Sequence, residues 1–129
     1  MGVSSDGMLY FGFEVGEEDQ KPDWLEDYDD LDDFIVAKSG LPDDAPYEAR
    51  RKVIEACPAE LQLYCSYDCP MYILGVRGAE HCVSRGYTEE INIRSLAVDP
   101  DKIHALKAWC DQHGIEWQQP KWLLCSMYG

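Results

Sequence analysis

The sequence predicts an α+β fold, in which three helices pack on a mainly antiparallel sheet of about five strands. Two observations carry this prediction: short apolar stretches joined by brief turns, which favour hairpins, and capped segments with apolar residues at helical spacing. The chain has 129 residues and 46% hydrophobic content, which is enough to bury one core. We therefore expect a single domain over residues 1–129.

The strand predictions rest on continuous or alternating apolar residues. Residues 8–15 are bulky on both faces, which indicates a buried strand, and Gly12 within them marks a bulge or a close approach of backbones. Residues 60–67 and 71–76 are separated by a short turn and predict an antiparallel hairpin. Further strands are predicted, in chain order, over 80–84 after a turn at 77–78, around 91–96, and over 122–128 beside 8–15.

Three helices are predicted from their ends and their apolar stripes. The first covers about 24–38, because Asp23 has the chemistry of an N-cap and Glu26 follows three residues later. The second covers about 45–57, after Asp44 as its cap and with Tyr47 facing inward. The third begins at Asp99-Pro100 and ends at Gly114. In the first helix, the apolar stripe expected to bind the core is Trp24, Tyr28, Leu31 and Ile35.

The charge of the chain is concentrated in residues 14–33. This stretch holds 11 acidic residues and one lysine, a net charge of -10, whereas the whole chain carries -14. It divides into a charged loop, 16–22, and the predicted helix, so that 14–38 forms an acidic loop-helix segment. The one basic cluster, 50–52, is expected to neutralise the neighbouring acidic helix. Such acidity disfavours direct binding to nucleic-acid phosphates and favours basic protein partners.

The acidic stretch is the candidate binding surface. If it were helical throughout, it would present one charge per about 2.7 Å of axis, against about 1.7 Å in duplex DNA. A nucleic-acid-mimicking surface is therefore physically plausible, and the alternative is an acidic helix that only keeps the protein soluble. The candidate partner-binding residues are Glu17, Glu18, Asp19, Asp23, Glu26, Asp27, Tyr28, Asp29, Asp30, Asp32 and Asp33.

Neither a catalytic motif nor a cofactor motif is present, so we expect no enzyme and no cofactor. Four cysteines are candidate zinc or thiol residues, but their spacing contains no CxxC pair; they are Cys65, Cys69, Cys82 and Cys110. A small structural zinc-containing or thiol-containing module is therefore one alternative function, and a small-ligand binder is another. The sequence contains no membrane-spanning apolar run and no secretory signal, so a cytoplasmic protein with reduced thiols is expected.

The two ends of the chain carry a resemblance. Residues 1–16, MGVSSDGMLYFGFEVG, and residues 120–129, PKWLLCSMYG, resemble the ends of small uncharacterised bacteriophage proteins, which open with an aromatic strand after a turn and close with an aromatic strand and a glycine. The resemblance covers about a fifth of the chain and implies a context of counter-defence or anti-CRISPR proteins. The resulting hypothesis is a phage-type inhibitor that acts in the host cytoplasm. Its partner would be a host protein with a basic surface, such as a CRISPR effector or another nucleic-acid-binding complex.

Overall fold

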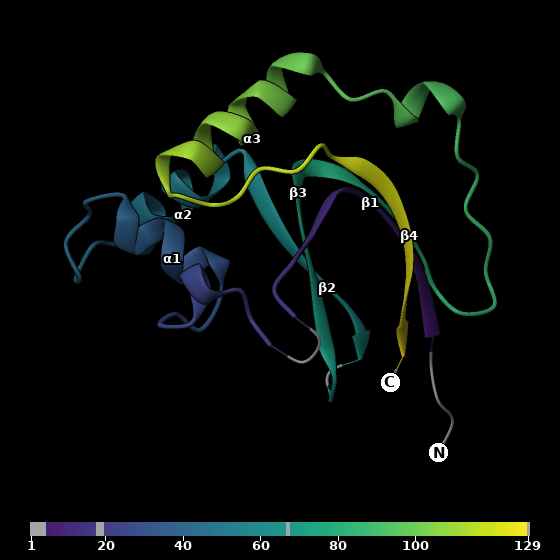
Figure 1. Ribbon diagram of the computed structural model, residues 1–129, viewed down its shortest axis with the longest axis horizontal. Coiled ribbons are helices and arrows are strands. Elements are labelled where there is room, and N and C mark those ends of the chain that lie inside the picture. The colour runs from purple at the N-terminus through teal and green to yellow at the C-terminus, as the bar shows by residue number, and fades with distance from the viewer. Residues whose placement is uncertain (1–4, 18–19, 67, 129) are drawn as a thin grey trace.

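The computed structural model describes residues 5–17, 20–66 and 68–128 (Figure 1). Within them, three helices and a sheet whose strands are mostly paired antiparallel confirm the α+β class and the three predicted helices. In chain order the elements are β1 (Ser5–Val15), a 3-10 turn η1 (Asp23–Leu25), α1 (Leu31–Lys38), α2 (Tyr47–Ala56), β2 (Ala59–Ser66), β3 (Pro70–Val83), a 3-10 turn η2 (Ile93–Leu96), α3 (Pro100–Gln112) and β4 (Lys121–Tyr128).

The sheet differs in detail from the prediction, because its strands close into a ring in the order β1-β3-β2-β4. β1 pairs antiparallel with β3 and with β4, and β2 pairs antiparallel with β3. The ring is closed by a short parallel pairing of β2 with β4, at residues 65–66 and 127–128. The described residues therefore form a mixed sheet of four strands rather than about five antiparallel ones. The predicted neighbourhood of the last strand and the first is confirmed.

One long strand, β3, replaces two of the predicted strands. The turn expected at 77–78 is wrong, since Val76 pairs with Ala59 of β2 and Glu80 pairs with Tyr10 of β1. Gly78 between them takes a positive φ of 82° without reversing the chain. The strand predicted around 91–96 is also wrong. In a closed sheet every strand already has two neighbours, which leaves no edge for this segment to join.

Gly12 lies at an irregularity in the pairing of β1 with β3, as the sequence predicts. The register shifts between Tyr10 and Gly12, and Gly12 then faces Gly75. A Cβ atom at Gly12 would lie 2.3 Å from the carbonyl oxygen of Leu74. The two backbones approach so closely that only a residue without a side chain fits.

The first helix begins later than predicted. Residues 24–38 do not form one helix: a single 3-10 turn at Asp23–Leu25 is followed by a turn, and α1 begins at Leu31. The N-cap of α1 is Asp30, whose Oδ1 accepts a hydrogen bond from the Asp33 amide at 2.8 Å. Asp23 caps nothing, since the residue before η1 is Pro22 and makes no side-chain cap bond. The intervening aspartates are poor helix formers that repel one another, which explains the interruption.

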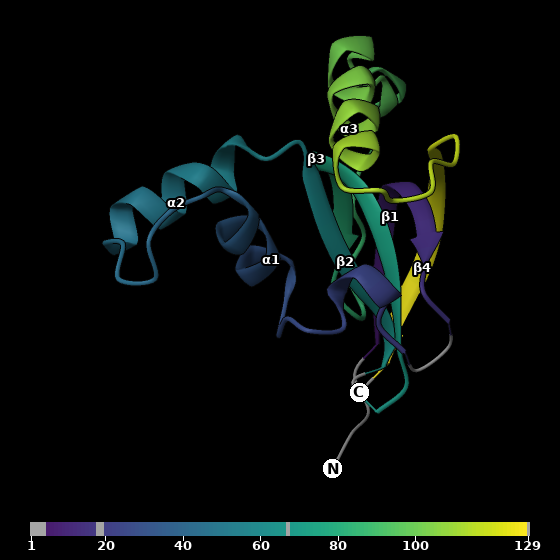
Figure 2. The same ribbon diagram turned by 60° about the vertical axis from the view of Figure 1, so that its left-hand side comes forward.

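Of the other two helices, α3 matches its predicted ends, whereas α2 differs from its prediction in its start and in its burial. α3 is capped by Asp99, which accepts from the Asp101 amide at 2.9 Å, and Gly114 follows with a φ of 68°, as predicted. α2 begins after Pro46 rather than after Asp44, and Tyr47, predicted to face inward, is 74% exposed. Figure 2 shows α1 between α2 and the sheet, so α2 has little core to cover. None of the helices in the described ranges is long and apolar enough to cross a membrane.

The buried residues form two clusters. The larger one joins the sheet to α1, α3 and η1; its most buried members are Leu25, Phe34, Ala59, Leu74, Leu106 and Cys110. The smaller cluster lies within the sheet and consists of Met8, Tyr10 and Ile73. Burial of Leu25, Leu31, Phe34 and Ile35 fixes the acidic region to the core between residues 25 and 35, even though this part is not one helix.

Candidate functional site

Residues 14–33, called here the acidic segment, present most of their carboxylates to solvent. Among the predicted binding residues, Asp33 and Tyr28 are half-buried, and Glu18 and Asp19 lie outside the described residues. The exposed ones are Glu17, Asp23, Glu26, Asp27, Asp29, Asp30 and Asp32. The structure thus brings the predicted acidic residues onto one anchored segment, distributed over η1, the turn after it and the start of α1.

Two aromatic rings anchor this segment. Trp24 packs edge-on against Phe34, with ring centroids 5.2 Å apart, and against Trp109 of α3 at 6.2 Å. Tyr28 packs edge-on against Phe34 as well, at 5.2 Å. Such aromatic pairs contribute about 0.5–1.5 kcal/mol each beyond the burial of their area. Tyr28 therefore supports the core, and its role as a contact to a partner stays a prediction.

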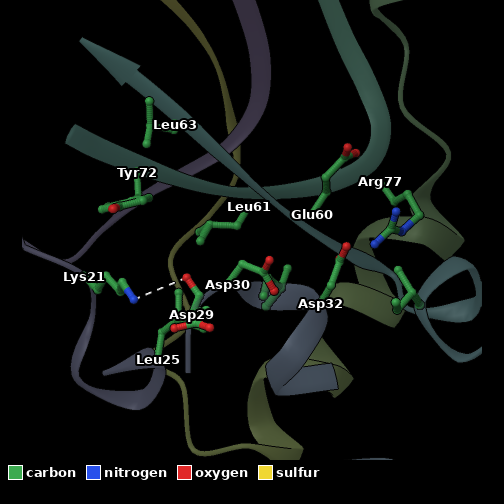
Figure 3. Close-up of a pocket in the computed structure, with 12 residues that line it drawn as sticks. Lys21, Leu25, Asp29, Asp30, Asp32, Glu60, Leu61, Leu63, Tyr72 and Arg77 are labelled. Atoms are coloured by element: carbon green, nitrogen blue, oxygen red, sulfur yellow. Dashed lines mark hydrogen bonds between the residues drawn. The ribbon is translucent and has the colours of Figure 1, made fainter. Parts of the chain in front are cut away.

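A cleft of about 450 Å³ separates the acidic segment from β2 and β3, and we call it the acidic cleft (Figure 3). It is lined by Lys21, Leu25, Asp29, Asp30, Leu31, Asp32, Ile54, Glu60, Leu61, Leu63, Tyr72 and Arg77. Figure 3 shows Lys21 and Asp29 near one end, and Asp32 and Arg77 near the other. Asp23 lines a separate hollow with Glu17 and Glu116, so the carboxylates of the acidic segment are not all gathered in one depression.

Both cations of the acidic cleft bind main-chain oxygens. The ammonium group of Lys21 donates to the carbonyls of Tyr28 at 2.8 Å and Asp29 at 3.3 Å, in the stretch where the helix is interrupted. The guanidinium of Arg77 donates to the carbonyls of Cys57 at 2.9 Å and Ala59 at 3.0 Å. These bonds hold the backbone around the cleft, and they direct both cations at carbonyls rather than at the carboxylates.

Asp32 is the carboxylate of the acidic cleft whose ionisation its surroundings disfavour. Its pKa is raised above the ordinary value, first by partial burial of the carboxyl group and next by the charge of Asp30, with smaller contributions from Asp33 and Glu60. The charge of Arg77 acts in the opposite direction but does not compensate. A cation that entered the cleft would therefore favour the ionised form of Asp32.

The basic cluster of α2, residues 50–52, lies close to the acidic segment. Among the described residues, however, its salt bridge is formed within α2. Arg50 and Arg51 share a groove between α1 and α2 with Asp32 and Asp33. The Arg51 guanidinium binds Glu55 within α2, at 2.8 Å. A second salt bridge, between Lys107 and Asp111, lies in α3. Both are exposed pairs spaced four residues apart on one helix, where solvent screens the attraction and leaves it little effect on stability.

The structure does not bring the cysteine candidates together. Over the ranges that it describes, Cys65, Cys82 and Cys110 are free thiols, and no group of three or more His, Cys, Asp or Glu side chains could hold a metal ion. Cys110 is wholly buried in the larger core cluster, where burial raises the pKa of its thiol to about 11, whereas Cys82 is exposed on β3. Cys65, in β2, and Cys69, in the connection between β2 and β3, are half-buried.

Several residues of the acidic cleft were missed by sequence reasoning. Lys21, Glu60 and Arg77 carry charge but stand outside any motif, and Arg77 falls where a turn was expected. Leu61 and Leu63 of β2 line the cleft with Glu60. What the sequence lacks is a signal that this part of β2 lies opposite the acidic segment.

Comparison of the chain with protein-family models, with curated proteins and with solved structures found no match. The resemblance of the two chain ends to bacteriophage proteins therefore stays a prediction.

Proposed function

We propose that this chain is a binding protein without catalytic activity, which occupies a basic, nucleic-acid-binding surface of a partner protein and thereby inhibits it. The observation that supports this proposal is the gathering of exposed carboxylates on one segment that aromatic and aliphatic side chains fix to the core. A surface that is already ordered loses less conformational entropy on binding than a mobile acidic tail would.

The carboxylates of the acidic segment are not spaced as they would be on one continuous helix. Because α1 begins only at Leu31, the charges do not follow one axis at a regular spacing. They instead cover a turn and two short helical pieces. The proposed surface therefore imitates the charge density of a nucleic acid rather than the geometry of its backbone, and its attraction to a basic partner should depend strongly on salt.

The partner we propose is a host defence protein or another nucleic-acid-binding protein, of which a CRISPR effector is one example. Its class follows from charge complementarity, since a surface that binds phosphates is the common protein surface with a high density of lysine and arginine. The bacteriophage context rests on the resemblance of the chain ends alone.

A pull-down from bacterial lysate tests this function. The immobilised chain should capture a nucleic-acid-binding protein, identified by mass spectrometry, at about 50 mM salt and release most of it at about 500 mM. Added duplex DNA should compete. Capture that is insensitive to both salt and DNA would contradict the proposal.

Two variants of equal net charge locate the binding surface. In one, Asp29, Asp30, Asp32 and Asp33 are changed to asparagine; in the matched control, Asp43 and Asp44 become asparagine and Glu89 and Glu90 become glutamine. All four control residues are exposed and lie outside the acidic segment. The first variant should lose capture and inhibition, and the control should retain both. Equal losses would show that only the overall charge matters.

A further inference from the structure

The acidic cleft has the shape and lining of a side-chain pocket. Its volume of about 450 Å³ falls within the roughly 300–1,000 Å³ of ligand pockets. Its accessible apolar surface comes from Leu61, Leu63 and Tyr72 of β2 and β3, which are half-buried. Leu25 and Leu31 of the acidic segment also line it, but they are already buried in the core. An occupant would therefore need an apolar part that covers these side chains.

The charge of the acidic cleft calls for a cationic occupant. Four carboxylates line it, Asp29, Asp30, Asp32 and Glu60, against the two cations Lys21 and Arg77. Because those cations donate to main-chain carbonyls, their capacity to bind the carboxylates is reduced. Hydrogen bonds within the chain engage Oδ1 of Asp30 and Oε2 of Glu60. The unbalanced charge thus faces the open cleft.

The arrangement of the carboxylates disfavours a metal ion as this cation. A divalent metal needs several oxygen ligands that converge on one point, and no such group exists among the described side chains. The carboxylates are instead spread along the cleft: Figure 3 shows Asp29 beside Lys21, and Asp32 toward Arg77. An extended organic cation matches this spread better than a compact one.

We infer that the acidic cleft receives an arginine side chain of the partner protein, with its methylene stem over Leu61 and Tyr72 and its guanidinium between Asp30 and Asp32. This inference rests on the proposed function, which it makes more specific. Arginine fits better than lysine, because guanidinium is more weakly hydrated, packs on aromatic rings and binds two carboxylates in one plane.

A nuclear magnetic resonance titration tests the cleft directly, without the partner. The probe is N-acetyl-arginine amide, added to the full ¹⁵N-labelled chain at low salt, with N-acetyl-lysine amide as the comparison. The amides of 29–32 and 60–63 should shift and saturate, and the lysine probe should bind several-fold more weakly. Shifts spread evenly over all acidic residues, or equal binding of both probes, would overturn the inference.

A pair of charge-matched variants separates the cleft from the rest of the acidic segment. D30N/D32N alters the cleft and keeps a side chain that can cap α1, whereas D23N/D27N removes the same charge outside the cleft. The first should weaken binding of the arginine probe about tenfold or more, and the second less than threefold. Equal weakening would refute the cleft site while leaving a salt-sensitive pull-down, and hence the proposed function, intact. Saturable cleft binding with no captured partner would refute only the proposed function.

Discussion

At the scale of single residues, the close backbone contact between Gly12 and Gly75 determines how β1 pairs with β3. A Cβ atom on Gly12 would meet the backbone of Leu74 at 2.3 Å and that of Gly75 at 2.6 Å. These are main-chain atoms, which cannot rotate aside as the end of a flexible side chain could. The fold therefore requires glycine at this position for lack of space, rather than for a left-handed backbone.

We expect Gly12→Ala to lower the free energy of unfolding by about 3 kcal/mol or more, at the upper end of the overpacking range. The control is Gly40→Ala, where φ is 83° and no heavy atom lies within 4 Å of the added Cβ. That change should cost only the strain of a left-handed residue, about 1–2 kcal/mol. Urea unfolding followed by circular dichroism measures both. A smaller effect at Gly12 than at Gly40 would show that the strand crossing can relax.

At the scale of elements, the start of α1 depends on a single cap. Asp30→Ala removes the acceptor of the Asp33 amide, and its expected cost is about 1 kcal/mol. Asp30→Asn should keep most of the stability, since asparagine caps nearly as well. Urea unfolding of the two variants gives the comparison. If the alanine and asparagine variants were equally stable, the cap would not contribute, and the carboxylate charge alone would account for any change.

The contact of α1 with α3 should make stability depend on pH. His113, at the end of α3, packs against Phe34 at 5.3 Å and Trp109 at 4.8 Å. Burial and then the charge of Lys38 lower its pKa below the ordinary value of 6.5. The unfolded chain therefore takes up a proton first as the pH falls below about 6.5, and the folded state loses stability from there downward.

His113→Phe keeps a ring in this contact and removes the titration. The variant should lose less stability than the original chain between pH 7.5 and pH 5.5, as measured by urea unfolding at several pH values in that range. Above pH 7 the free energy of unfolding should change with pH by nearly the same amount in the two chains, because His113 is neutral there in both the folded and the unfolded state. Parallel pH profiles would place the pH dependence elsewhere in the molecule.

The elements also show which sequence signals were reliable. The cap at Asp99 and the stop at Gly114 were predicted correctly, because each signal stands alone in its segment. Around α1, by contrast, several aspartates compete as caps, and the choice of Asp30 over Asp23 depends on burial of Leu25 and on the bonds of Lys21 to two carbonyls. Those are tertiary contacts, which local patterns do not encode.

At the scale of the whole molecule, closure of the sheet and formation of the acidic cleft share one cause. Both require β2 to lie between β3 and β4, with its Leu61 face toward the acidic segment. Composition and charge could predict an acidic surface and its anchoring stripe. They could not predict the parallel pairing at 65–66 or the position of Arg77, because both arise from residues that are far apart in the sequence.

The net charge of -14 should make the folded state more stable as salt is added. Repulsion is strongest where the carboxylates are densest, and it falls with the Debye length, which is about 10 Å at 0.1 M. The melting temperature should therefore rise between about 20 mM and about 300 mM sodium chloride. Among the described residues of the acidic segment, only Asp32 and Asp33 lie in the first turn of an α-helix. The helix dipole there offsets the repulsion by about 0.3–1 kcal/mol for each of them, so repulsion dominates.

The two four-residue variants of equal charge decide whether this repulsion is local. The variant with asparagine at 29, 30, 32 and 33 should show a smaller rise in melting temperature with salt than the control changed at 43, 44, 89 and 90. Scanning calorimetry of both chains and the parent at each salt concentration measures the difference. The same increase of the melting temperature in the two variants would mean that stability depends on the total charge of the chain. The acidic segment would then contribute no more repulsion than acidic residues elsewhere.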